Sequence, residues 1–213
     1  MKRIILLIWI TLFTNLLSYS QKQTTFGIKA GLNYSSFIDS KNDQSITYYE
    51  GKVGFYAGGF ISFKINEKLS LRPELLYSKQ NSYFMTNGLH IIVYNIGGVY
   101  AITSREGTIK ESMLYVPIIL EYKLNEKVYF GFGPQLGYSL SKELEKIENT
   151  NIETHSNTIK ENINSEVFEI GMGVEMGYSI NKNCQVSARY NYGINKRQNS
   201  NTSIIQLGIS YNL

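Results

Sequence analysis

Residues 168–180 have the sequence FEIGMGVEMGYSI, in which two kinds of side chain alternate. Aromatic and aliphatic residues occupy every second position from Phe168 to Ile180. Between them stand Glu169, Glu175, a serine and three glycines. A period of two is typical of a β-strand, because successive side chains point to opposite faces. The stretch therefore predicts a strand with one apolar face and one face of small or charged residues.

The same alternation recurs along the chain from Thr25 onward. It predicts eight strands, at residues 25–36, 54–65, 69–78, 112–123, 128–140, 167–180, 184–193 and 203–212. Three connections are short and asparagine-led, at 65–69, 124–128 and 180–184. The other connections are long and polar, at 37–53, 79–111, 141–166 and 194–202. Because short and long connections alternate, all short turns would lie at one end of an up-and-down meander.

The aromatic residues indicate which way the apolar face points. A soluble lipocalin-like barrel would turn this face inward, whereas a membrane barrel turns it toward lipid. Two aromatic girdles are predicted on the apolar face, with Tyr34, Tyr77, Tyr138 and Tyr192 at the long-loop ends and Phe26, Phe63, Tyr122, Tyr178 and Tyr211 toward the short turns. Such girdles around an aliphatic band are typical of outer-membrane barrels. We therefore predict an all-β fold, an eight-stranded antiparallel up-and-down transmembrane β-barrel of OmpA/OmpX-like architecture.

The opposite face carries charged residues that would point into a narrow lumen. They are Lys29, Lys64, Arg72, Glu74, Glu121, Lys123, Glu169, Glu175 and Arg189. Positive and negative charges nearly balance, and unpaired buried charges are costly, so a structural network of ion pairs is predicted. An ion path or a catalytic pair of carboxylates is the functional alternative. An eight-stranded lumen is filled by side chains, which argues against general porin activity.

Three prolines conflict with this fold. Pro73, Pro117 and Pro134 all fall within predicted strands. Proline cannot donate a ladder hydrogen bond, and a closed barrel has no free edge on which to place it. We expect β-bulges or local lapses in strand pairing at these positions.

The first twenty residues, MKRIILLIWITLFTNLLSYS, predict a signal peptide. Two cations precede an apolar run that ends in small residues, the usual layout before a cleavage site. The run is short for a membrane-spanning helix of ~20 residues. Cleavage before Gln21 would leave one barrel domain, residues 21–213. Loss of Lys2 and Arg3 lowers the formal charge from +4 to +2, which removes electrostatic support for nucleic-acid binding.

Few residues are available for catalysis. One cysteine and two histidines argue against a disulfide framework, a thiolate cluster or a zinc site, and we expect no cofactor. A Ser/His/acid site acting on lipid could be drawn from Glu153, His155 and Ser156, but adjacent residues in a polar loop are more often simply solvated. We expect a non-enzymatic protein. A lipid-modifying barrel enzyme and narrow-pore transport remain alternatives.

One long connection contains an apolar stretch at residues 89–100. This stretch either extends two strands beyond the membrane as a hairpin or forms a contact surface for a partner. Extended strands are the simpler interpretation.

Several segments resemble the outer-membrane β-barrel domain of PorT-like proteins of Bacteroidetes, a porin-family group of small barrels. They are LSLRPELLYSKQ (69–80), MLYVPIILEYKL (113–124), GFGPQLGYSLS (131–141), FEIGMGVEMGYSI (168–180) and SARYNYGI (187–194). The resemblance implies a cell outer membrane location, and PorT itself is linked to protein secretion and gliding. We expect a monomer surrounded by outer-membrane lipid and lipopolysaccharide, with a protein partner at the extracellular loops. Its expected role is surface interaction, membrane integrity or accessory work in protein secretion.

Overall fold

The computed structural model describes residues 24–38, 41–42, 45–94, 97–150, 153–162, 167–197 and 200–213, with the side chains of all but 41–47, 86–105 and 146–162. The expected signal peptide, residues 1–20, lies outside the described residues and stays a prediction. Every regular element in the described part is a strand. No helix there is both long and apolar enough to span a bilayer.

Ten strands make up the described part of the chain. They are β1 (Thr24–Phe37), β2 (Lys41–Asn42), β3 (Ser45–Lys64), β4 (Leu69–Tyr94), β5 (Gly97–Lys123), β6 (Val128–Thr150), β7 (Glu153–Asn162), β8 (Phe168–Ser179), β9 (Cys184–Gly193) and β10 (Thr202–Asn212).

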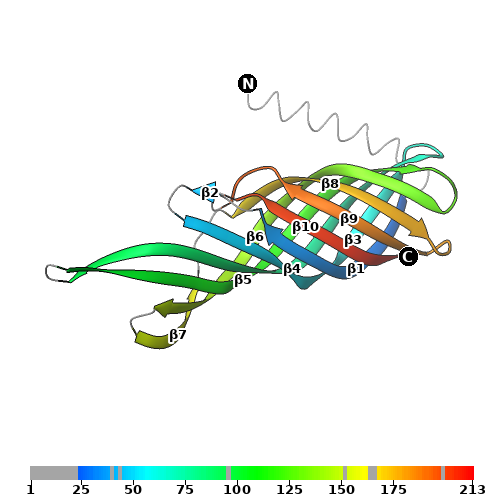
Figure 1. Cartoon of the computed structure of the whole chain (residues 1–213). Coiled ribbons are helices and arrows are strands. Elements are labelled where there is room, and N and C mark those ends of the chain that lie inside the picture. Colours follow the sequence, from blue (N-terminus) through cyan, green and yellow to red (C-terminus); the bar gives the residue numbers. More distant parts are fainter. Residues whose placement is uncertain are drawn as a thin grey trace, which may run out of the picture.

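Eight of these strands close into a barrel with the order β1-β10-β9-β8-β6-β5-β4-β3, and β3 pairs back with β1. All ladders between them are antiparallel. The remaining strands, β2 and β7, extend the sheet beside β3 and β6 (Figure 1). The predicted eight-stranded up-and-down barrel is therefore confirmed, and each predicted strand corresponds to one barrel strand.

The apolar face of the barrel points outward. In β8, Val174 is 58% exposed, whereas the next residue, Glu175, is 2% exposed. Exposed and buried residues alternate in the same way along β1 and β9. The residues of the two predicted aromatic girdles belong to this outward face. Phe63 is half-buried, and the others are exposed: Tyr34, Tyr77, Tyr138, Tyr192, Phe26, Tyr122, Tyr178 and Tyr211. A surface of this kind is stable against lipid and not against water.

The three short turns share one geometry. Asn125 Oδ1 accepts hydrogen bonds from the backbone N–H groups of Lys127 and Val128, each at 2.8 Å. Asn66 and Asn181 make the equivalent bonds in the other two turns. An asparagine side chain that bonds backbone two residues ahead forms an Asx turn. The sequence similarity of the turns thus reflects a repeated structure.

The prolines interrupt pairing but do not cause bulges. Between β3 and β4, the Phe60–Glu74 pair is followed directly by the Phe63–Leu71 pair, so pairing lapses beside Pro73 without a change of register. Similar lapses occur beside Pro117 in the β4–β5 ladder and beside Pro134 in the β5–β6 ladder. The expected lapses are confirmed, and the alternative of bulges at the prolines is wrong. In the ladders of the barrel itself the bulges lie elsewhere, between Lys52 and Phe55 and next to Met113.

Three of the four predicted long loops are largely strand, which corrects the prediction for 37–53, 79–111 and 141–166. The β4–β5 ladder continues to the pair Tyr94–Gly97, so residues 79–94 and 97–111 form a long hairpin. This confirms extended strands as the interpretation of 89–100. The hairpin projects from the barrel at the end opposite to the C-terminus and the β8–β9 turn (Figure 1). Beyond the membrane water can contact both faces of a ladder, so the apolar period that marks a membrane strand disappears there.

Candidate functional site: the filled lumen

Six charged side chains meet in the lumen toward the short-turn end of the barrel. This basal cluster consists of Lys29, Arg72, Glu74, Glu121, Glu175 and Arg189. Each stands at an inward position of its strand because side chains alternate across the barrel wall. None is more than 7% exposed. Three cations face three carboxylates, so the cluster as a whole is neutral.

Glu74 and Glu175 are the centre of the basal cluster. Arg189 donates to both oxygens of Glu74, at 2.8 and 2.7 Å, and its Nε donates to Glu175 Oε2 at 2.6 Å. Lys29 Nζ donates to the same Glu175 oxygen at 2.7 Å. A two-pronged contact between guanidinium and carboxylate is the strong and directional form of an ion pair. Both carboxylates are thereby held in place by cations from other strands.

Arg72 fills the other side of the basal cluster. Its Nε donates to Glu74 at 2.9 Å, and its terminal nitrogens contact Glu121 and Glu175. The ring centroids of Phe60 and Tyr129 lie 5.3 and 5.5 Å from the guanidinium carbon, within the range of cation–π contacts.

Two glycines make room for these rings. A Cβ atom at Gly27 would lie 2.2 Å from Phe60 Cζ, and one at Gly177 would lie 2.1 Å from Tyr129 Cζ. Such distances are far inside van der Waals contact, and each glycine is the ladder partner of the aromatic residue, so the ring can lie over the neighbouring strand only because that strand has no side chain there.

A second, smaller group of charges lies nearer the long-strand end. This upper cluster consists of Glu111, Glu169 and Arg197. Arg197 enters from the β9–β10 connection, bonds Glu169 at 3.0 Å and contacts Glu111. Burial alone would lower the pKa of Arg197, but the two carboxylates hold this pKa above its ordinary value. Tyr115 joins the group because its hydroxyl donates to Glu169 at 3.2 Å.

Apolar side chains separate the two clusters and cover the upper one. A band of Tyr56, Leu76, Met113, Tyr115 and Ile204 is at most 1% exposed, and Leu76 stands between Glu74 and Gln80 along β4. Above the upper cluster, Phe37, Ile109 and Leu144 form an apolar cap, with Tyr49 and Phe84 packed against it. The described part of the lumen is thus filled by alternating charged and apolar layers.

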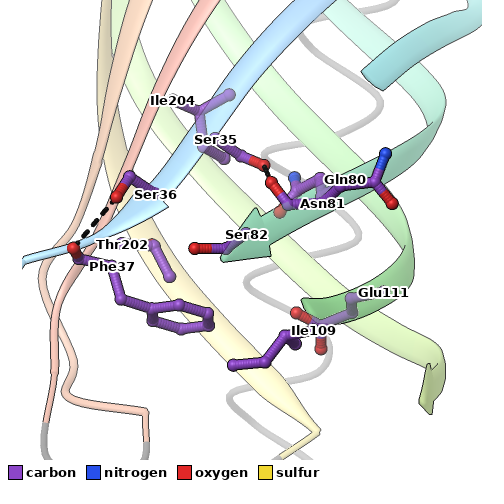
Figure 2. Close-up of a pocket in the computed structure, with 10 residues that line it drawn as sticks. All are labelled: Ser35, Ser36, Phe37, Gln80, Asn81, Ser82, Ile109, Glu111, Thr202 and Ile204. Carbon is purple, nitrogen blue, oxygen red and sulfur yellow. Dashed lines mark hydrogen bonds between the residues drawn. The ribbon is translucent and has the colours of Figure 1, made fainter. Parts of the chain in front are cut away.

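A small cavity lies between the band and the cap, with a volume of about 10 Å³. Figure 2 shows its lining, including Ser35, whose hydroxyl donates to the carbonyl of Asn81 at 3.0 Å, and Phe37. Thr202 also lines this space, and its hydroxyl has no hydrogen-bond partner among the described residues. The volume suits about one water molecule. It is much too small for a solute.

The structure corrects part of the predicted charge network. Lys64 and Lys123 have the inward alternation but are the last residues of β3 and β5, and both are exposed at the short-turn rim. Water reaches the lumen mouth there, so these side chains stay solvated rather than entering the interior. Glu169 is buried as predicted, but in the upper cluster and apart from the other carboxylates. The remaining six predicted residues form the basal cluster.

Sequence reasoning missed Glu111, Arg197 and Lys142. Glu111 continues the inward alternation of β5 by one step beyond the predicted start at 112, so extending the period of two would have found it. Arg197 lies in the β9–β10 connection, beyond the end of β9 at Gly193, where no strand alternation applies. Lys142 is buried because the bulge beside Met113 shifts the pairing of β6, so that residues 142 and 144 point inward in place of 141 and 143. No sequence pattern marks that shift.

The family model of the outer membrane protein β-barrel domain matches residues 19–198. The chain belongs to this outer-membrane barrel family. The membership agrees with the closed barrel and its apolar outer face, and it places the protein in the outer membrane. No curated protein matches the sequence.

Solved barrels of the same kind resemble this family member in fold. Neisserial surface protein A is 13% identical, with a TM-score of 0.52, and the match covers 89% of this chain and 99% of that one. Ail, the attachment invasion locus protein of Yersinia pestis, is 13% identical with a TM-score of 0.48, over 90% of this chain and 99% of that one. The outer membrane protein OprG from Pseudomonas aeruginosa is 12% identical with a TM-score of 0.40, over 92% and 98%. At such identities the likeness to the Neisserial protein concerns the fold alone.

The residues considered for lipid hydrolysis lie at the long-strand end. Glu153, His155 and Ser156 belong to β7, which pairs with β6, and their side chains are outside the described part. Among the described residues, no three His, Cys, Asp or Glu side chains are grouped so as to hold a metal ion.

Proposed function

We propose that this barrel is a non-enzymatic surface protein that presents an extracellular β-hairpin to a protein partner. The observation that carries the proposal is the length of β4 and β5, which have 26 and 27 residues. A tilted membrane strand needs only about 9–11 residues. In outer-membrane barrels the short turns face the periplasm and the longer connections face outward. The surplus of both strands therefore projects from the cell.

The composition of the hairpin supports this role. Its end, residues 89–100, is rich in isoleucine, valine and tyrosine, although no lipid is expected to cover it. Apolar and aromatic residues at an exposed position are typical of protein contact sites. The filled lumen supports the same conclusion, because charged and apolar layers leave the described interior without room for a solute path.

The test is to shorten the hairpin. Replacing residues 86–105 with Asn-Gly joins Met85 to Glu106, which already pair. We expect normal membrane insertion, seen as an unchanged mobility shift on heating, and loss of the protein adducts that a membrane-impermeant cross-linker gives with the intact protein on cells. A matched control replaces residues 146–159 with Asn-Gly, which joins the paired residues Glu145 and Lys160. Equal adducts from both shortened proteins and the intact one would refute the role of the hairpin.

The resemblance to PorT-like barrels favours an accessory of protein secretion as the second candidate. Cells that make only the protein with the shortened hairpin separate the two proposals. If the protein is a secretion accessory, these cells should secrete less total protein. A surface-contact role predicts unchanged secretion.

A further inference from the structure

Gaps in strand pairing divide the barrel wall into two unlike halves. The β3–β4, β4–β5 and β5–β6 ladders each lack two successive residue pairs where a proline stands, without a change of register. The β1–β3, β1–β10, β9–β10, β8–β9 and β6–β8 ladders run from end to end without a missing pair. We call the wall from β3 to β6 the interrupted half, and the wall from β6 through β8, β9, β10 and β1 to β3 the continuous half.

The three gaps of the interrupted half lie side by side. Pro73 pairs with Ile118 across β4 and β5, and the register of the β5–β6 ladder places Ile118 opposite Pro134. Pro117, the third proline, directly precedes Ile118 on the middle strand. Since proline has no backbone N–H group, each of the three ladders lacks a donor at this row. Neighbouring strands can therefore separate here at a lower cost than along an uninterrupted ladder.

Residues 72–75 of β4 have a gap on each side. Residues 72 and 73 lack partners on β3, and residues 74 and 75 lack partners on β5. In a bilayer, backbone groups without hydrogen bonds are costly, because no water is present to bond them. This segment therefore needs another form of support to stay in the wall.

The basal cluster supplies that support from across the lumen. Arg189 on β9 donates to both oxygens of Glu74, at 2.8 and 2.7 Å. Arg72 contacts Glu175 on β8, and Lys29 on β1 lies 3.6 Å from Glu74. Each of these contacts joins β4 to a strand of the continuous half. The segment with the weakest ladders is thus tied by ion pairs to the strands with the most complete ladders.

We propose that the interrupted half opens locally at the row of prolines, and that the basal cluster is the latch that keeps it shut. Short turns of outer-membrane barrels face the periplasm, and the row lies toward the short turns, below the apolar band that includes Leu76. The opening joins the periplasmic mouth of the lumen to the bilayer, while the band still closes the outer half. The proposal goes beyond the surface role of the hairpin, which concerns the other end of the barrel.

Hydrogen exchange followed by mass spectrometry tests the opening, on the full-length protein in lipid nanodiscs. Peptides that cover residues 69–78 and 112–120 should exchange about ten-fold faster than peptides that cover 203–211 in the continuous half. Equal protection in the two halves would overturn the opening. A gap that stays shut speeds exchange only at the amides that it leaves without a bond, so the latch is tested next.

Arg189→Lys releases the latch, because it keeps the charge but loses the two-pronged contact with Glu74. Exchange over residues 69–78 should rise about ten-fold and exchange over 203–211 should not change. The matched control is Arg197→Lys, which makes the same change in the upper cluster and should leave 69–78 as it is. No rise, or an equal rise in both halves, would overturn the latch. Heat-dependent gel mobility identifies variants that fold, and Lys29→Gln serves as a second latch variant.

The row of prolines is tested by returning its donors. Pro73→Ala combined with Pro134→Ala should slow exchange over residues 69–78 and remove most of the response to Arg189→Lys. The matched control is Val174→Ala combined with Ile209→Ala, which trims two exposed side chains of the continuous half and adds no donor. This control should leave the response unchanged. A full response to Arg189→Lys in the protein without Pro73 and Pro134 would overturn the row as the place of opening.

Discussion

Glu175 contacts the same three cations of the basal cluster as Glu74, whereas an ion pair with Arg72 alone is described for Glu121. Lys29, Arg72 and Arg189 all contact its carboxylate, and the Tyr129 hydroxyl donates to it at 2.9 Å. A buried ion group of this kind adds little net stability as a whole, but removing one partner leaves the others buried and uncompensated. The compensation of buried charge in the basal cluster therefore depends on its central residues.

Glu175→Gln should lower the free energy of unfolding by roughly 3–5 kcal/mol, because three buried cations would then face two carboxylates. Urea-induced unfolding in lipid vesicles measures this loss. Glu121→Gln is the matched control, since among the described residues the cation that pairs with Glu121 is Arg72, and the Glu121 side chain is 9% exposed. Its loss should be less than half as large. Equal losses in the two variants would contradict a cluster centred on Glu175.

At the scale of elements, the three short turns define one rim of the barrel. In each turn an asparagine side chain accepts two backbone hydrogen bonds and so holds the hairpin in shape. The turns can form early, because all their bonds are local. They set the register in which the paired strands begin.

Asn125→Ala should lower the free energy of unfolding by about 1–2 kcal/mol, the value of two exposed hydrogen bonds at about 0.5–1.5 kcal/mol each. Asn125→Asp keeps the acceptor oxygen and should lose much less. The same unfolding measurement compares the two. An equal loss in the aspartate variant would show that the side-chain acceptor is not what stabilises the turn.

The strands within the membrane could be predicted from sequence, but of their extensions only the stretch at residues 89–100 was expected to be strand. Inside the bilayer one face of each strand meets lipid, and this imposes a period of two from Phe168 to Ser179 and in its neighbours. Residues 79–111 have no such constraint, although they continue the same ladder. Alternation marked all six residues of the basal cluster as inward, but it also placed Lys64 and Lys123 in the lumen, and both are exposed on the rim. The burial of Lys142 was not predictable, because a bulge changes which face its strand turns inward.

For the molecule as a whole, the layered lumen bears on transport. The apolar band and the apolar cap lie above the basal cluster, and all are made by side chains that pack across the barrel. An eight-stranded barrel has just enough interior to be filled in this way. Ions crossing the protein would have to displace several layers.

The intact protein should therefore give no discrete conductance steps in planar lipid bilayers. Replacing Tyr56, Leu76 and Tyr115 together with alanine removes most of the apolar band and should produce small steps. This variant is also the positive control for insertion. Regular steps from the intact protein would contradict a closed lumen and favour narrow-pore transport.

The basal cluster also has a consequence for the order of assembly. Lys29 and Glu175 are 146 residues apart in sequence, and Arg189 and Glu74 are 115 apart. Contacts so distant form late, because a long stretch of chain must be ordered before they can be made. Until β1 meets both β10 and β3, each of these charges needs its own shell of water. Closure of the barrel and dehydration of these charged side chains therefore occur together. While they are hydrated, the charges oppose closure of a partly formed barrel, although their ion pairs stabilise the closed one.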